Sequence, residues 1–157
     1  MSRDWPTKEL PGLNESNCLD HSEKTNSYNC IAWAIGDTSR WWWPLPFKGA
    51  GNYWPEDTPR EETLEAFITL FTNRGYEVCD DGSNEDGYEK VAMFAKVNGC
   101  PVPTHAAYQL GSGKWTSKLG PFEDVIHDVV TDINGPAYGM PIVYLKRPRS
   151  NHPANRN

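Results

Sequence analysis

Residues 104–119, THAAYQLGSGKWTSKL, predict the centre of the fold, because two β-prone runs flank a glycine-rich turn. Gly111-Ser112-Gly113 between two such runs is a typical signal for an antiparallel hairpin. The largely apolar run over 90–95 predicts a buried strand, and residues 76–79 and 140–145 predict two more. Together these runs indicate an antiparallel sheet.

Three helices are expected around this sheet. Residues 27–35 predict a short apolar helix that ends at a glycine. A second helix, over 58–75, has Thr58 as its expected N-cap and apolar residues at helical spacing. A third, over 121–134, is indicated by acidic residues in its first turn, which the helix dipole favours. The order of elements predicts the α+β class, with N-terminal helices packed on an antiparallel sheet.

The length of the chain favours a single domain that spans all 157 residues. Within it we expect an irregular arm over 1–26, a helical part over 27–75, a sheet part over 76–147 and a mobile tail over 148–157. Seven tryptophans and thirteen prolines indicate long, ordered loops packed by aromatic rings.

Charge and hydropathy exclude several classes of partner. A net charge of −6 and a pI near 5.2 argue against nucleic acid and anionic membranes. No apolar run approaches the roughly 20 residues of a transmembrane helix, and residues 1–6 lack the apolar core of a signal peptide. We therefore expect a protein that is cytoplasmic, or exported without a cleaved signal peptide as an effector would be. Four cysteines at scattered spacing indicate reduced thiols.

Cys30 is the candidate nucleophile. The segment Asn29-Cys30-Ile31-Ala32-Trp33-Ala34 places it in the first turn of the expected helix, which Ser27 or Asn26 could cap. Unpaired backbone N–H groups and the helix dipole favour a thiolate at this position. A free cysteine is more often simply buried in a core, but a structural cysteine has no reason to prefer the first turn.

His105 is the candidate general base. It opens the strand expected over 104–110, after a proline-rich loop. A histidine at the edge of a strand is more often only a polar residue near solvent. An imidazole brought to the Cys30 thiol, however, completes the pair that a cysteine hydrolase needs.

The order of these segments resembles that of the NlpC/P60 and CHAP cysteine hydrolases of the papain-like superfamily. In those families the nucleophile lies on an early helix, an apolar strand ends in a loop, and the catalytic histidine begins the next strand. The resemblance covers residues 27–36 and 88–120. The chain also resembles an uncharacterised bacterial domain family with Tyr-Asn-Cys-Ile-Ala-Trp-Ala and Thr-His-Ala-Ala segments, which implies no activity. The first resemblance implies a papain-like fold with Cys30 and His105 as the catalytic pair.

The resemblance places the third catalytic residue at Ser117, where relatives carry His, Asn, Asp, Gln or Glu. The expected hairpin register puts Ser117 on the same face as His105, and a slip of one residue would put Lys118 there instead. Asp124 or Glu123 is the alternative third residue, because a carboxylate stabilises an imidazolium better than a hydroxyl does.

The mechanism that this pair implies is hydrolysis through a thioester. His105 takes the proton from Cys30, the thiolate attacks a carbonyl, and the oxyanion lies at the helix N-terminus. The Cys30 N–H and the side chain of Asn29 or Asn26 are the candidate oxyanion donors. The expected reaction is cleavage of an amide bond, as in a peptidase, an amidase or a deamidase. A peptide, a protein or a peptidoglycan fragment is the implied substrate.

The aromatic loop over 41–54 supplies the alternative function. Its tryptophans, Trp41, Trp42, Trp43 and Trp54, are the candidate substrate-binding side chains. Such a run with several prolines more often packs a loop over the core. If it faces solvent instead, the chain is a non-catalytic binding module of the same fold.

No cofactor and no metal site are expected. Cys18-x-x-His21 lacks a second close pair of ligands, which makes a zinc site improbable. His127 is expected on the third helix in a structural role, and His152 in the mobile tail. The acidic stretch over 80–87 is expected to be a solvated loop.

Overall fold

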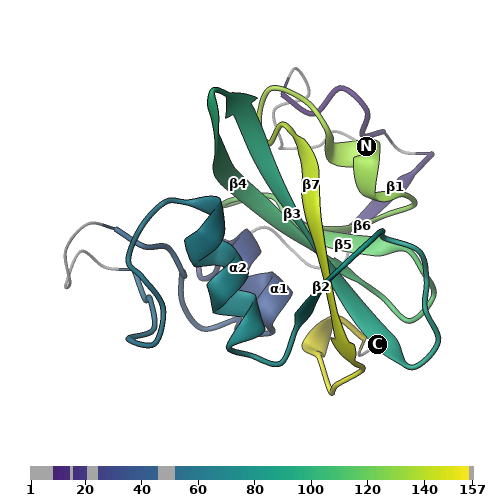
Figure 1. Ribbon diagram of the computed structural model, residues 1–157. Coiled ribbons are helices and arrows are strands. Elements are labelled where there is room, and N and C mark those ends of the chain that lie inside the picture. Colours follow the sequence, from purple (N-terminus) through teal and green to yellow (C-terminus); the bar gives the residue numbers. More distant parts are fainter. Residues whose placement is uncertain (1–8, 15, 21–24, 46–51, 156–157) are drawn as a thin grey trace.

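The computed structural model describes residues 9–14, 16–20, 25–45 and 52–155 (Figure 1). The α-helices in these ranges are α1 (Cys30–Ile35) and α2 (Leu64–Thr72). The strands are β1 (Cys18–Asp20), β2 (Glu77–Cys79), β3 (Tyr88–Asn98), β4 (Cys100–Gln109), β5 (Trp115–Lys118), β6 (Asp124–His127) and β7 (Met140–Pro148). The short 3-10 helices η1 (Val130–Ile133) and η2 (Pro153–Asn155) follow β6 and β7.

All seven strands belong to one antiparallel sheet, in the order β1-β6-β5-β4-β3-β7-β2. The two longest strands, β3 and β4, pair at its centre, and the three-residue strands β1 and β2 form its edges. The hairpin predicted from residues 104–119 is confirmed as β4 and β5, with Tyr108 opposite Thr116.

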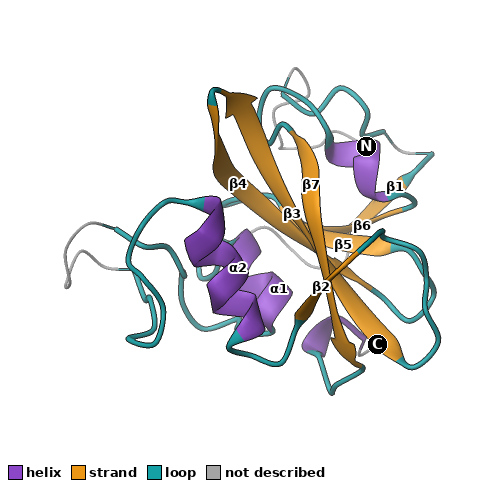
Figure 2. Ribbon diagram, in the orientation of Figure 1, coloured by secondary structure: helices purple, strands orange, loops and turns teal. Residues whose placement is uncertain are grey.

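The predicted α+β class, with N-terminal helices packed on a sheet, is wrong. The described residues form a β-rich fold in which two short helices accompany a seven-stranded sheet (Figure 2). The arm expected to be irregular contributes strand β1, and residues 121–134 contribute strand β6 instead of a helix. No helix in the described ranges has the length and hydropathy needed to cross a membrane.

Strand β6 replaces the predicted third helix because the segment pairs on both sides. Lys118 of β5 is the partner of Asp124, and Cys18 of β1 is the partner of His127. The acidic side chain that suggested a helix start has another role, since Asp124 accepts a hydrogen bond from the Tyr28 hydroxyl at 2.5 Å. Pairing in the sheet therefore outweighs the local helix signal.

Helix α1 begins directly after Asn29, which is its N-cap in place of the predicted Asn26 or Ser27. The Asn29 Oδ1 accepts a hydrogen bond from the Ala32 N–H at 3.2 Å. Gly36 ends the helix with a left-handed φ of 102°, as predicted. The first residue of α1 is therefore Cys30.

Helix α2 begins at Leu64, later than predicted, because Thr63 rather than Thr58 is its N-cap. The Thr63 Oγ1 accepts a hydrogen bond from the Ala66 N–H at 3.2 Å. The Thr58 hydroxyl instead donates to the Asp57 carboxylate at 2.8 Å. Residues 58–62 therefore remain irregular and extend the loop that contains the tryptophans.

The sheet separates two groups of buried side chains. Met93 and Ala106 lie on the side that packs against α1 and α2, here called the helix face. Phe94 and Ala107 lie on the opposite side, here called the arm face, which residues 10–13, Cys18 and residues 130–138 cover. Successive residues of a strand point to opposite faces, so neighbouring side chains on β4 enter different layers.

The segment after β7 packs on the domain, in contrast to the mobile tail expected over 148–157. His152 is 2% exposed, and its ring stacks on Tyr108 with centroids 3.8 Å apart. Its Nε2 lies 3.2 Å from the Ala34 carbonyl oxygen, near the end of α1. The C-terminal segment therefore holds α1 in place.

Candidate functional site

Cys30 lies in the wall of an apolar pocket of about 310 Å³. One side of this Cys30 pocket comes from the start of α1 and from the tryptophan loop that follows it. The other side comes from β4, the turn between β5 and β6, and the segment before β7. None of the described lining residues carries a formal charge. They are Asn29, Cys30, Trp41, Trp43, Asn52, Thr104, Gly120 and Tyr138.

Two opposing influences act on the Cys30 thiol. Burial is the larger one and raises its pKa to about 11. Hydrogen bonds from the backbone of Ala106, Ile31 and Cys30 itself, and the charge of Lys118, lower the pKa and oppose that effect. At pH 7 the thiol is therefore protonated, although groups that would stabilise a negative charge on the sulfur surround it.

His105 leaves β4 on the arm face, away from Cys30. Its partner on β3 is Phe94, and the two rings lie 5.4 Å apart on that face. The next residue, Ala106, lies on the helix face, and its backbone forms a hydrogen bond with the Cys30 sulfur. Cys30 thus contacts the strand next to His105, but no hydrogen bond joins the sulfur to the imidazole.

The His105 ring is enclosed by aromatic side chains. It stacks on Tyr138 with centroids 4.1 Å apart, and neither ring nitrogen has a hydrogen-bond partner among the described residues. Burial, and to a smaller extent His127, hold its pKa well below the usual value. The imidazole is therefore neutral at pH 7. An unpaired buried imidazole costs stability, and such groups occur at functional sites.

Tyr138 separates His105 from the Cys30 pocket, since its ring stacks on the imidazole and also lines the pocket. The Thr104 hydroxyl donates to its carbonyl oxygen at 2.5 Å. Gly139, at a φ of 76°, lies so close to the Ala95 carbonyl oxygen that an added Cβ would be 2.1 Å away, so only glycine fits. Sequence reasoning missed Tyr138, and the glycines on either side of it were the available signal.

The expected third residue, Ser117, lies on the arm face with His105 but is bonded to His127. The Ser117 Oγ lies 2.8 Å from the His127 Nε2, and the His127 Nδ1 lies 2.9 Å from the Val129 carbonyl oxygen. A carbonyl only accepts, so Nδ1 carries the proton and Nε2 accepts the serine hydroxyl. His127 lies on strand β6, not on the predicted helix, and its two nitrogens are both used.

The alternative third residues do not bond His105 either. Asp124 accepts a hydrogen bond from the hydroxyl of Tyr28, which lies just before α1. The Glu123 Oε1 is buried and has no hydrogen-bond partner in the described part of the chain. The structure therefore does not assemble Cys30, His105 and a third residue into a hydrogen-bonded triad.

The candidate oxyanion donors have other partners. The Asn29 side-chain amide forms two hydrogen bonds with the backbone of Trp42. Its Oδ1 accepts one from the Trp42 backbone N–H at 3.1 Å, and its Nδ2 donates one to the Trp42 carbonyl oxygen at 2.9 Å. Asn26 contributes its backbone carbonyl, which accepts the Trp41 indole N–H. The backbone of Ala106, not an asparagine side chain, is the additional group that bonds the Cys30 sulfur.

The four candidate tryptophans divide into two pairs. Trp41 and Trp43 line the Cys30 pocket. Trp42 and Trp54 are only 5% and 3% exposed. The Trp42 indole donates to Asp37 at 2.7 Å, and Trp54 packs on a phenylalanine of α2. One pair therefore forms the pocket wall, and the other holds the loop on the core.

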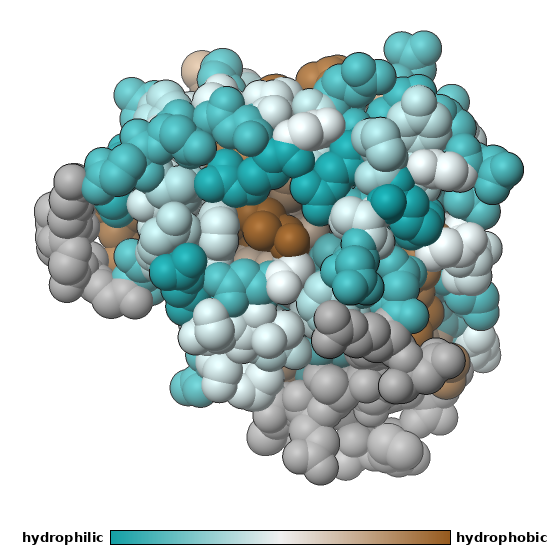
Figure 3. All heavy atoms as spheres, turned by 90° about the horizontal axis from the view of Figure 1, so that it is seen from below, coloured by the Kyte–Doolittle hydropathy of each residue, from teal (hydrophilic) through white to brown (hydrophobic). Residues whose placement is uncertain are grey.

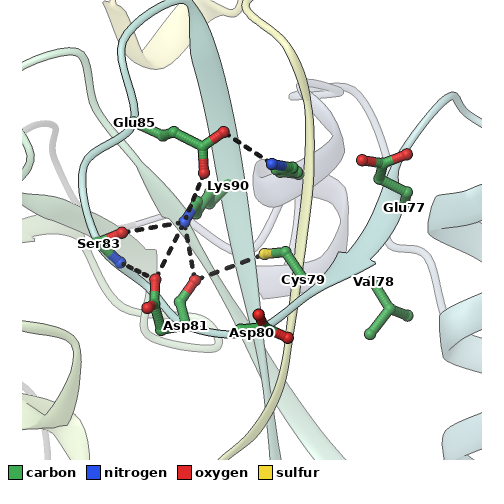
Figure 4. A pocket seen from close by; sticks show the side chains of 9 residues that line it. Glu77, Val78, Cys79, Asp80, Asp81, Ser83, Glu85 and Lys90 are labelled. Atoms are coloured by element: carbon green, nitrogen blue, oxygen red, sulfur yellow. Dashed lines mark hydrogen bonds and ion pairs between the residues drawn. The ribbon is translucent and has the colours of Figure 1, made fainter.

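A second pocket, of about 330 Å³, lies beside β2 and the 80–87 loop (Figure 4). The buried Lys90 points into it, with its Nζ 2.9 Å from the Asp81 carbonyl oxygen and 3.5 Å from a Glu85 carboxylate oxygen. Lys146 also bonds Glu85, at 2.7 Å. The acidic stretch expected to be a solvated loop thus surrounds a buried ammonium group.

Seen from below, the molecule is mostly hydrophilic, with apolar atoms only in small patches (Figure 3). No group of three or more His, Cys, Asp or Glu side chains among the described residues could hold a metal ion. His21, considered above for zinc, lies outside the described residues, and none of the four cysteines forms a disulfide.

The chain matches a protein family over most of its length. The family model described as "Domain of unknown function (DUF7689)" matches residues 20–146, a range that includes both α1 and the strand of His105. No curated protein and no solved structure matches the chain.

Proposed function

Since the chain belongs to the DUF7689 family, a domain of unknown function, we propose a function from the site itself: a cysteine hydrolase that cleaves an amide bond through Cys30. The observation that supports this proposal most directly is the position of the Cys30 sulfur. Cys30 is the first residue of α1, it lines an apolar pocket, and the backbone of Ala106, Ile31 and Cys30 bonds its sulfur. The backbone groups act against the effect of burial on the thiol pKa and would stabilise negative charge on the sulfur once its proton is removed, at a point where a substrate carbonyl can enter.

His105 is the proposed proton acceptor. It is neutral at pH 7 and has unpaired nitrogens, which is the state that a general base requires. In the resting arrangement it lies on the arm face under Tyr138, across β4 from the sulfur, so the reaction requires Tyr138 to move aside and the imidazole to turn toward the Cys30 pocket, which the Tyr138 ring lines. The imidazole then takes the thiol proton, and the thiolate attacks the amide carbonyl. The C–N bond breaks, the amine leaves with the proton of the imidazolium, and a thioester remains on Cys30. Water hydrolyses this thioester with His105 as base, which releases the acid and restores the thiol. The resemblance to the NlpC/P60 and CHAP hydrolases agrees with these two roles.

The pocket suggests the kind of substrate. Trp41, Trp43 and Tyr138 supply aromatic walls, and the described lining has no charged side chain that would pair with a charged group. We therefore propose a neutral, apolar or aromatic group next to the scissile amide, as in a peptide side chain. Peptide, protein and peptidoglycan amides all remain within this class.

The test is hydrolysis of a panel of acyl p-nitroanilides with apolar, acidic and basic acyl groups. The wild type should cleave the apolar members fastest, and Cys30→Ala should lose all activity. Cys100→Ala is the matched control, since Cys100 is exposed and does not line the pocket. Activity retained in Cys30→Ala would refute the proposal.

A binding module is the second candidate, and one observation favours it. The resting thiol is protonated and is not hydrogen-bonded to His105. In that case Cys30→Ala should bind the apolar acyl anilides as tightly as the wild type, and no member of the panel should be cleaved. Quenching of tryptophan fluorescence on titration measures this binding, because Trp41 and Trp43 line the pocket.

A further inference from the structure

Lys118 is a fully buried lysine in the wall behind the Cys30 pocket. Its Nζ donates to the Thr25 carbonyl oxygen at 2.6 Å and to the Gly120 carbonyl oxygen. Gly120 lines the pocket, and Thr25 precedes α1. The ammonium group therefore joins the chain that leads into α1 to the opposite wall of the pocket.

The groups that face this ammonium come from three elements. Asp124 is its partner on β6, and Glu123 lies just before that strand. The centroid of the Tyr28 ring, just before α1, lies 5.1 Å from the Lys118 Nζ. The Cys30 thiol, at the start of α1, interacts with the charge of Lys118. Asp124 and Glu123 keep Lys118 charged, whereas burial favours the neutral amine.

Burial and the neighbouring charges shift the pKa of Lys118 in opposite directions. Burial is the largest influence and lowers the pKa of Lys118 to about 8, against the opposing effects of Asp124, Cys30 and Glu123. The same charge lowers the pKa of Cys30. The thiol and the amine thus act on each other, as a coupled pair of titrating groups must.

We propose that Lys118 is a positioning residue whose positive charge stabilises negative charge on the Cys30 sulfur and so regulates the reactivity of the pocket. This inference rests on the proposed role of Cys30 as nucleophile. Lys118 touches no reacting atom and acts through Cys30, from behind the pocket wall. Loss of its proton therefore removes a favourable interaction with the thiolate.

The experiment is site-resolved alkylation of the full chain by iodoacetamide, followed by mass spectrometry across pH 6–10. Lys118→Met removes the charge and keeps the apolar stem, and Lys118→Arg keeps the charge. Lys90→Met is the matched control, since Lys90 is equally buried but lies in the other pocket, shown in Figure 4. Lys118→Met should slow Cys30 alkylation about tenfold at pH 6–7, where Lys118 is fully charged, because one nearby charge shifts a pKa by about one unit or more, and it should raise the apparent Cys30 pKa.

Lys118→Arg should restore most of the rate, and Lys90→Met should leave it unchanged. An unchanged pH profile in folded Lys118→Met overturns the inference. If that variant fails to fold, Lys118→Gln decides, because its amide can still donate to the Thr25 and Gly120 carbonyls without a charge; it should slow Cys30 alkylation as Lys118→Met would, and an unchanged rate overturns the inference. Alkylation needs no substrate, so this outcome is distinct from a failure to detect hydrolysis.

Discussion

His105 and Cys30 approach the same strand, β4, from opposite faces of the sheet. The backbone of Ala106 bonds the Cys30 sulfur on the helix face, while the adjacent His105 ring lies between Phe94 and Tyr138 on the arm face. The Cys30 sulfur and the His105 imidazole, which the sequence predicts to be a catalytic pair, therefore lie on either side of the same strand and share no hydrogen bond. This separation makes the role of His105 open to direct test.

His105→Phe should keep or increase stability while it abolishes hydrolysis. Phenylalanine preserves the aromatic contacts and removes two unpaired buried nitrogens, so we expect a gain of up to about 1 kcal/mol in the free energy of unfolding. Urea denaturation measures it. His127→Phe is the matched control, and it should cost about 1–3 kcal/mol because Ser117 loses its partner. A large loss of stability in His105→Phe would mean that the imidazole has a structural partner.

Protonation of His152 should destabilise the domain at low pH. Burial is the largest cause that lowers its pKa, to about 4, below the 6.5 of an unfolded histidine. The unfolded chain therefore binds a proton more readily, and stability falls as the pH drops from about 6.5 to 4. Complete titration corresponds to about 3 kcal/mol. Unfolding measured at several pH values should show a shallower slope for His152→Phe, and an unchanged slope would contradict the assignment.

Trp41→Ala and Trp42→Ala should separate binding from stability. Trp41 lines the Cys30 pocket, so its loss should raise KM for apolar anilides several-fold with little effect on unfolding. Trp42 is buried and bonds Asp37, so its loss should cost about 3–5 kcal/mol. Steady-state kinetics and thermal unfolding of both variants provide the measurements. Equal effects of the two variants on KM and stability would show that the loop acts as one structural unit.

Asn29→Ala should destabilise the domain by about 2 kcal/mol or more. It removes the N-cap of α1 and both bonds to Trp42, whereas Thr63→Ala, the control at the N-cap of α2, removes one capping bond. Substitution of a cap typically costs about 1 kcal/mol, which is the value expected for Thr63→Ala. Chemical denaturation of the two variants tests the difference. Equal losses would indicate that the two hydrogen bonds to Trp42 contribute nothing.

Local sequence signals predicted several elements correctly. The glycine turn at 111–113 predicted the β4–β5 hairpin, and Gly36 predicted the end of α1, because both depend on residues close together in the chain. The segment 121–134 was misassigned since its acidic residues match a helix start equally well. Only pairing with β1 and β5, which lie far away in sequence, decides that it is a strand.

The sequence by itself determined that Cys30 occupies the first turn of a short helix and that His105 lies on a strand, although that strand begins earlier than predicted, at Cys100. Only the tertiary structure decided which face each side chain occupies. The direction of a side chain on a strand alternates with every residue, so the face depends on sheet register and not on composition. Tertiary contacts likewise placed Tyr138 over His105 and Lys118 behind the Cys30 pocket, because buried polar groups acquire their partners from distant segments when the layers pack.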